Sequence, residues 1–170
     1  MHRSLWRSLA STLTCIALAS LALPRDAAAQ ATTSGDSIAV LAVVQGFFDA
    51  MIRQDSVKAR AALAPGAQLS SVRAGGTGPV RFQSDSVFIV RIATSKQKLL
   101  ERMWTPAVRV SGDIASVWTP YDFHIDGKFS HCGVDVFDLL RTSSGWKIVS
   151  VAYTVQPQGC APSPLGPVSP

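Results

Sequence analysis

Two aspartates and a histidine in the second half of the chain, Asp122, His131 and Asp135, are the residues best suited to chemistry. Histidine titrates near neutral pH, and burial can raise the pKa of an aspartate toward neutrality, so the three could transfer protons as general acids and bases. The same side chains could ligate a metal ion, or could simply face solvent or a dimer partner. The residues leave these three interpretations open, but we predict neither a metal site nor a cofactor.

Aromatic residues are interspersed with these ionisable groups. Together they could line a pocket for a flat, apolar ligand, although the same spacing is also typical of an ordinary core. Other chemistry has no support, because the serines lack a G-x-S-x-G motif and the glycine-rich stretch 74–79 lacks the lysine of a phosphate-binding loop. The predicted ligand-binding residues are Trp104, Trp118, Tyr121, Phe123, His124 and Tyr153.

Long strands must position these groups. Alternating polarity predicts an antiparallel meander, because the turns between its strands, at Gly112-Asp113, at Asp126-Gly127 and around Ser144, are too short for a crossover. The expected strands are 99–111, 114–125, 128–142 and 146–156.

The tight hairpin turns also predict which residues face one another. Counting back from Asp126-Gly127 pairs Asp122 with His131 and Trp118 with Asp135. One face then collects the ionisable groups, and the other is more uniformly apolar and suited to packing on helices. A single bulge would reverse the faces beyond it. The predicted ionisable face carries Glu101, Trp118, Asp122, His124, His131, Asp135 and Tyr153, and the predicted apolar face carries Trp104, Tyr121, Phe123, Cys132 and Asp138.

The first 29 residues have the three-part pattern of a secretory signal peptide. Arg3 and Arg7 precede an apolar run over 9–23, and Ala27-Ala28-Ala29 supplies the small residues of a cleavage site. The apolar run has about 15 residues, fewer than a bilayer span needs. We therefore expect export to the periplasm or the medium. No later segment is expected to span a membrane.

The rest of the chain divides into three parts. Residues 30–36 are expected to form a flexible leader and 37–156 a single domain, in which helices over about 37–54, 55–64 and 85–92 precede the meander. Such an order predicts an α+β fold. Residues 157–170 contain five prolines and are expected to be disordered.

Removal of the signal peptide changes both charge and cysteine content. The signal holds three arginines and one aspartate of the 16 basic and 11 acidic residues, which leaves a net charge of about +3 with no basic stripe, so nucleic-acid binding is not expected. Cys15 also leaves with the signal. The predicted register places residue 156 opposite Cys132, and the chain can turn back after it, so a disulfide between Cys132 and Cys160 is expected in an oxidising compartment.

Three segments resemble the nuclear transport factor 2-like superfamily, and most closely its lumazine-binding-like and polyketide-cyclase-like (SnoaL-like) branch. They are FFDAMIRQD, the GD hairpin before IASVW, and DGKFSHCGVDVFDLLRTSSGWKIVSVAYT. The resemblance covers about 37–156. It implies a cone in which a curved antiparallel sheet wraps around N-terminal helices, a pocket at the open end, and frequent homodimers through the outer face of the sheet. It does not imply one activity.

The sequence therefore predicts an exported protein whose pocket binds a small, mostly apolar molecule. An enzyme that uses aspartate and histidine for acid-base chemistry, as an isomerase, cyclase or dehydratase would, is the first alternative. A dimeric interaction domain without catalysis is the second.

Overall fold

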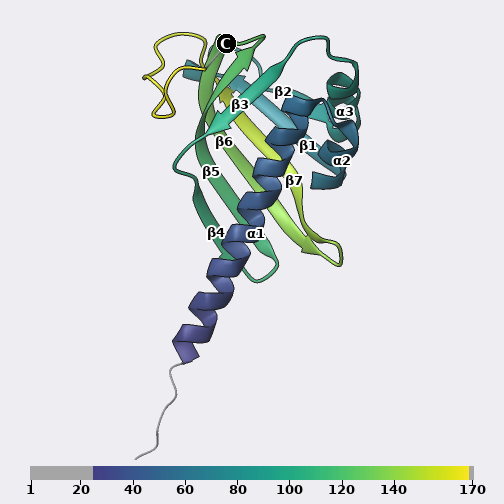
Figure 1. The fold of residues 1–170 in the computed structure, drawn as a ribbon, viewed down its shortest axis with the longest axis vertical. Coiled ribbons are helices and arrows are strands. Elements are labelled where there is room, and N and C mark those ends of the chain that lie inside the picture. Colours follow the sequence, from purple (N-terminus) through teal and green to yellow (C-terminus); the bar gives the residue numbers. More distant parts are fainter. Residues whose placement is uncertain (1–24, 169–170) are drawn as a thin grey trace, which may run out of the picture.

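The computed structural model describes residues 25–168, so most of the predicted signal peptide lies outside the described residues. A seven-stranded mixed sheet curves around helix α1 (Figure 1). The strand order is β2-β1-β7-β6-β5-β3, and β4 also pairs with β5. The elements in chain order are α1 (Arg25–Arg53), α2 (Ser56–Ala62), β1 (Leu63–Arg73), a short 3-10 helix (Ala74–Gly76), β2 (Arg81–Ser84), α3 (Asp85–Thr94), β3 (Leu99–Met103), β4 (Ala107–Ser111), β5 (Ile114–Ile125), β6 (Lys128–Thr142) and β7 (Gly145–Val155).

The α+β cone agrees with the sequence prediction, and the meander is antiparallel as expected. One pairing differs, because β1 runs parallel to β7, which makes the sheet mixed. The expected strand over 99–111 is also divided into β3 and β4. Thr105 adopts a positive φ of 43°, and Pro106 has no N–H to donate to a neighbouring strand.

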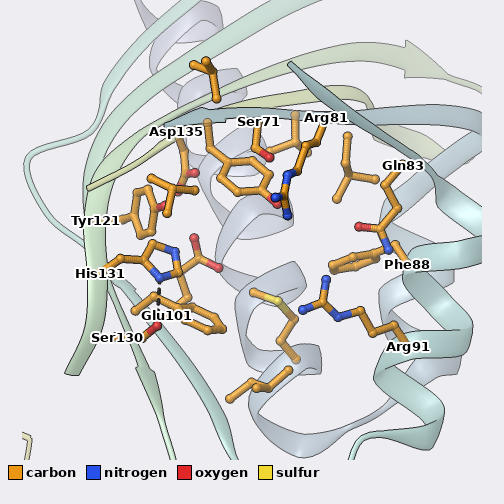
Figure 2. Close-up of a pocket in the computed structure, with 18 of the residues that line it drawn as sticks. Ser71, Arg81, Gln83, Phe88, Arg91, Glu101, Tyr121, Ser130, His131 and Asp135 are labelled. Atoms are coloured by element: carbon orange, nitrogen blue, oxygen red, sulfur yellow. Dashed lines mark hydrogen bonds between the residues drawn. The ribbon is translucent and has the colours of Figure 1, made fainter. Parts of the chain in front are cut away.

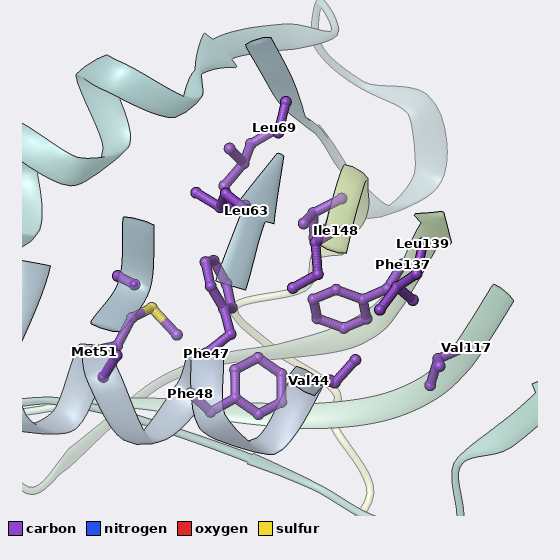
Figure 3. Close-up of a cluster of buried hydrophobic side chains, with 14 of the residues drawn as sticks. Val44, Phe47, Phe48, Met51, Leu63, Leu69, Val117, Phe137, Leu139 and Ile148 are labelled. Atoms are coloured by element: carbon purple, nitrogen blue, oxygen red, sulfur yellow. The ribbon is translucent and has the colours of Figure 1, made fainter. Parts of the chain in front are cut away.

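Helix α1 supplies much of the core. Its buried residues recur every three or four positions, which places them on one side of the helix, against the concave face of the sheet. Phe48 packs edge-on against Phe137 of β6, with ring centroids 5.6 Å apart, and Val44 lies near Val117 and Leu139 (Figure 3). The helix begins at Arg25 and so includes residues 30–36, which the sequence predicts to form a flexible leader.

Among the described residues, one segment, Gly35–Arg53, is long and apolar enough to cross a membrane by composition alone, with a mean hydropathy of 1.5. The expectation that no segment after the signal peptide reaches this level is therefore wrong. The apolar side of this segment contributes Val40, Val44 and Phe48 to the core of the domain.

A bulge at Ser130 changes the predicted faces. His124 pairs with Phe129 as expected, but Phe123 pairs with His131, so Ser130 has no partner on β5. The predicted pairs of Asp122 with His131 and Trp118 with Asp135 are therefore wrong, because every later residue of β6 is shifted by one position. His131 and Asp135 lie on the concave face, while Asp122, His124 and Trp118 lie on the convex, outer face.

The C-terminal segment 157–168 lies along the outer face, whereas its composition predicts disorder. Cys132 and Cys160 form the expected disulfide. Backbone hydrogen bonds join Cys132 to Gln156 in both directions, and Arg102 donates to the carbonyl of Gly166 at 3.1 Å. A covalent link and contacts with the sheet thus hold a segment that could not fold alone.

Candidate functional site

A cavity of about 950 Å³ opens between the concave face of the sheet, helix α3 and the C-terminal half of α1. Its volume is in the range of pockets that bury a small organic ligand. Aromatic side chains from several elements form much of its lining. Those predicted from the sequence are Tyr121, Phe123 and Tyr153, and the others are Phe47, Phe48, Phe82, Phe88 and Phe137.

Two carboxyl groups, Glu101 of β3 and Asp135 of β6, meet inside the cavity (Figure 2). Strand pairing places both on the concave face. Glu101 pairs with Phe123 of β5, and Asp135 pairs with Thr119 of the same strand. Asp135 is only 1% exposed, and its Oδ2 has no hydrogen-bond partner among the described residues. A ligand could satisfy this buried oxygen.

The two carboxyls are close enough to share a proton. Burial, followed by the charge of Asp135, raises the pKa of Glu101 well above its ordinary value. Burial also raises the pKa of Asp135 to about 7, although the hydrogen bond from Glu101 acts in the opposite direction. Near neutral pH the pair therefore retains a proton, with Glu101 as donor and Asp135 as acceptor.

Tyr121 and His131 stand beside the carboxyl pair. The Tyr121 hydroxyl donates a hydrogen bond to the carbonyl of Thr154 at 2.8 Å, and burial raises its pKa, so it remains a neutral phenol. Burial lowers the pKa of His131. Its Nδ1 lies 3.0 Å from the Ser130 hydroxyl. A neutral imidazole and a neutral phenol can both form hydrogen bonds with an uncharged ligand.

Gly133 makes this arrangement sterically allowed. A Cβ at this position would overlap the carbonyl of Thr154 and approach the Tyr121 ring to 2.8 Å. The bare backbone of β6 therefore lets Tyr121 lie flat enough for its hydroxyl to reach Thr154. The φ of Gly133 is not positive, so a glycine is needed here because of the close packing and not because of its backbone conformation.

The structure separates the predicted catalytic set. His131 and Asp135 face the cavity, but Asp122 lies on the outer face, where Arg102 donates two hydrogen bonds to it at 2.8 and 2.6 Å. Burial raises the pKa of Asp122, but the hydrogen bonds from Arg102 and Ser163 and the nearby positive charge together outweigh burial and lower the pKa overall. Asp122 is therefore an ion-paired carboxylate outside the cavity.

The predicted ligand-binding residues are divided in the same way. Tyr121, Phe123 and Tyr153 line the cavity. Trp104 and His124 instead line a shallow groove between the outer face and the C-terminal segment, and Trp118 is 47% exposed on that face.

Glu101, Arg81 and Arg91 also line the cavity, and the sequence predicts none of them as a site residue. Strand alternation does place Glu101 on the same side of β3 as Leu99, and Leu99 also lines the cavity. The missing information was the break between β3 and β4, which shifts β3 by one residue against β5, so that Glu101 pairs with Phe123 and not with His124 as the hairpin register predicts. No group of three or more side chains suited to bind a metal occurs among residues 35–168.

The chain matches the family described as "Putative lumazine-binding" over residues 35–154. No curated protein is similar enough in sequence to match it. The solved structures that resemble it include an NTF2-like protein with a cystatin-like fold from Novosphingobium aromaticivorans, with 12% identity, coverage of 79% of this chain and 91% of that one, and a TM-score of 0.64.

Two further structures support the same fold. One, described as a "putative dehydratase from the NTF2-like family" of Streptomyces avermitilis, is 20% identical, covers 72% of this chain and 96% of its own, and has a TM-score of 0.58. The other, an NTF2-like protein of unknown function from Shewanella baltica, is 18% identical, covers 74% and 97%, and has a TM-score of 0.57. The cone, its cavity and the match over 35–154 together show that the chain belongs to the lumazine-binding-like branch of the nuclear transport factor 2-like superfamily.

Proposed function

We propose that this protein is exported and binds a small molecule with an apolar, ring-sized body in its cone cavity, holding a polar group of that molecule on the Glu101–Asp135 pair. The observation that carries the proposal is the orphaned Oδ2 of Asp135 at the wall of an otherwise largely aromatic cavity. A buried polar atom without a partner costs free energy. A ligand that donates a hydrogen bond to it would recover that cost.

Fluorescence titration with N-phenyl-1-naphthylamine, a neutral dye with an apolar body and one N–H donor, tests the proposal. We expect one dye per chain. Asp135→Leu should weaken binding about tenfold, the effect of one lost buried hydrogen bond. Asp138→Leu, on the outer face of the same strand, is the matched control. Absence of dye binding, or equal affinity in both variants, would contradict the proposal.

A second candidate function is proton transfer to and from the bound molecule. The pKa of Asp135, raised to about 7, favours it, because a base with this pKa is strong and yet partly ionised at neutral pH. Asp135 would remove a proton from a carbon next to a carbonyl. Glu101 would donate its own proton to the carbonyl oxygen, and an enol would result. Isomerases, cyclases and dehydratases all use such a step.

Ring opening of 5-nitrobenzisoxazole needs only one proton abstraction and tests this candidate without a known substrate. Catalysis should follow the ionisation of a group with a pKa of about 7 and be lost in Asp135→Asn. His131→Ala then asks whether the imidazole contributes. A rate equal to that of free acetate would exclude proton-transfer catalysis by this pair.

We also propose that two copies associate through the outer face. Ile114, Trp118 and Leu140 are 56%, 47% and 43% exposed there, and Ile114 pairs directly with Leu140, while Trp118 lies four residues further along the same face of β5. Sedimentation of the wild type should give a dimer, and Trp118→Asp a monomer with an unchanged circular dichroism spectrum. A wild-type monomer would refute this assembly.

A further inference from the structure

The cavity wall opposite the carboxyl pair is basic. Arg81 extends into the cavity from β2 and Arg91 from α3, while Glu101, His131 and Asp135 lie along the other wall (Figure 2). A third arginine, Arg73 at the end of β1, also lines the cavity, and no acidic side chain accompanies these three on their side.

The two arginines that extend into the cavity have no partner among the described residues. Three other arginines do have one, since Arg53 pairs with Asp49, Arg102 with Asp122, and Arg141 with Asp36. Arg81 and Arg91 make no side-chain hydrogen bond or ion pair within residues 35–168. Two convergent guanidinium groups with ten N–H donors between them can hold an anion by paired hydrogen bonds.

The carboxyl pair does not supply that anion. Burial alone raises the pKa of Asp135, and burial together with Asp135 and Asp122 raises the pKa of Glu101, so no arginine contributes to either shift. Because the pair retains a proton, its wall carries less negative charge than two ionised carboxylates would. The two walls therefore act as separate binding groups at opposite sides of one cavity.

The space between the two walls is apolar. The Phe88 ring stacks on Phe47, with centroids 5.1 Å apart and planes 20° from parallel, and Phe82 and Val87 line the side toward solvent. Phe82 is 74% exposed, so its ring is accessible to a ligand in the cavity. A flat apolar body would contact these rings while its ends reached both polar walls.

We infer that the natural ligand is an organic anion, with a carboxylate, sulfonate or phosphate held by Arg81 and Arg91 and a ring-sized apolar body that reaches the Glu101–Asp135 pair. This inference rests on the proposed function, since it specifies the ligand of the same cavity. The inference differs from the proposed function because it requires the ligand to carry a negative charge. The sequence predicts a small, mostly apolar ligand and gives no indication of this charge.

A matched pair of dyes tests the charge requirement. 8-Anilinonaphthalene-1-sulfonate and N-phenyl-1-naphthylamine share one ring skeleton and differ by a sulfonate. We expect the wild type to bind the sulfonate at least about tenfold more tightly, because charged hydrogen bonds are stronger than neutral ones. The preference should decrease as salt increases.

The variant Arg81→Gln/Arg91→Gln should lose about tenfold or more of its affinity for the sulfonate and keep its affinity for the neutral dye within about twofold. Arg60→Gln/Arg109→Gln removes the same charge from α2 and the outer face, and should leave both affinities unchanged. Equal binding of the two dyes by the wild type, or equal losses in the two double variants, would overturn the inference while leaving the proposed function intact. Binding of neither dye would overturn both.

Discussion

Replacing Asp135 with asparagine should change how the stability of the protein depends on pH. Burial raises the pKa of Asp135 from its ordinary value of 3.8 to about 7, so the folded protein binds a proton there more tightly than the unfolded chain does. The stability contributed by this proton is complete below about pH 4 and is lost as the pH rises through about 7. A shift of this size corresponds to about 4 kcal/mol of unfolding free energy.

Urea unfolding followed by tryptophan fluorescence, from about pH 4 to about pH 9, measures this effect. The wild type should lose stability across this range. The asparagine of Asp135→Asn cannot ionise, so this variant should lose less stability than the wild type. The difference in unfolding free energy between the two proteins should therefore change by up to about 4 kcal/mol toward alkaline pH. Asp138→Asn is the control, because it measures how the pH dependence of stability changes when a carboxyl outside the cavity is lost. Parallel pH profiles for the wild type and Asp135→Asn would refute the assignment of a raised pKa to this residue.

Three further predictions concern the packing, the disulfide and the carboxyl pair. Gly133→Ala should destabilise the fold by more than about 2 kcal/mol, since its methyl group would overlap the backbone. Gly46→Ala, in open space on α1, should instead stabilise the fold by about 0.5–1 kcal/mol. Chemical denaturation compares the two variants, and equal effects would contradict the steric argument. Cys160→Ser should cost about 3 kcal/mol, because the lost disulfide joins residues 28 positions apart, and intact mass under non-reducing conditions should show no free thiol at either position in the wild type. Glu101→Ala removes the hydrogen bond that lowers the pKa of Asp135, so carboxyl-edited NMR should show Asp135 titrating at higher pH; an unchanged midpoint would mean that the two groups do not interact.

Much of the fold could be predicted from local sequence. Three- and four-residue spacing predicts the core helix, and alternation with short turns predicts the meander. The disulfide follows from the pairing of Cys132 with residue 156, which the structure confirms. These features depend on interactions between residues close in sequence, or on turns with a defined number of residues.

The site could be predicted only in part, because it depends on a single extra residue. Nothing local marks Ser130 as a bulge, yet this bulge brings His131 and Asp135 onto the cavity face and leaves Asp122 outside. The pairing of Glu101 with Asp135 joins strands that are not neighbours in the chain. The basic wall likewise depends on how β2 and α3 fold back over the sheet, which composition does not determine.

A crystal structure of the full folded chain with 8-anilinonaphthalene-1-sulfonate bound tests the central claim most directly. We predict one dye in the cone cavity, with its sulfonate within hydrogen-bond distance of Arg81 and Arg91 and its ring system against Phe88. From there the ring system should extend toward Glu101 and Asp135. A dye bound only on the outer face near Trp118, with the cavity filled by solvent, would contradict the account.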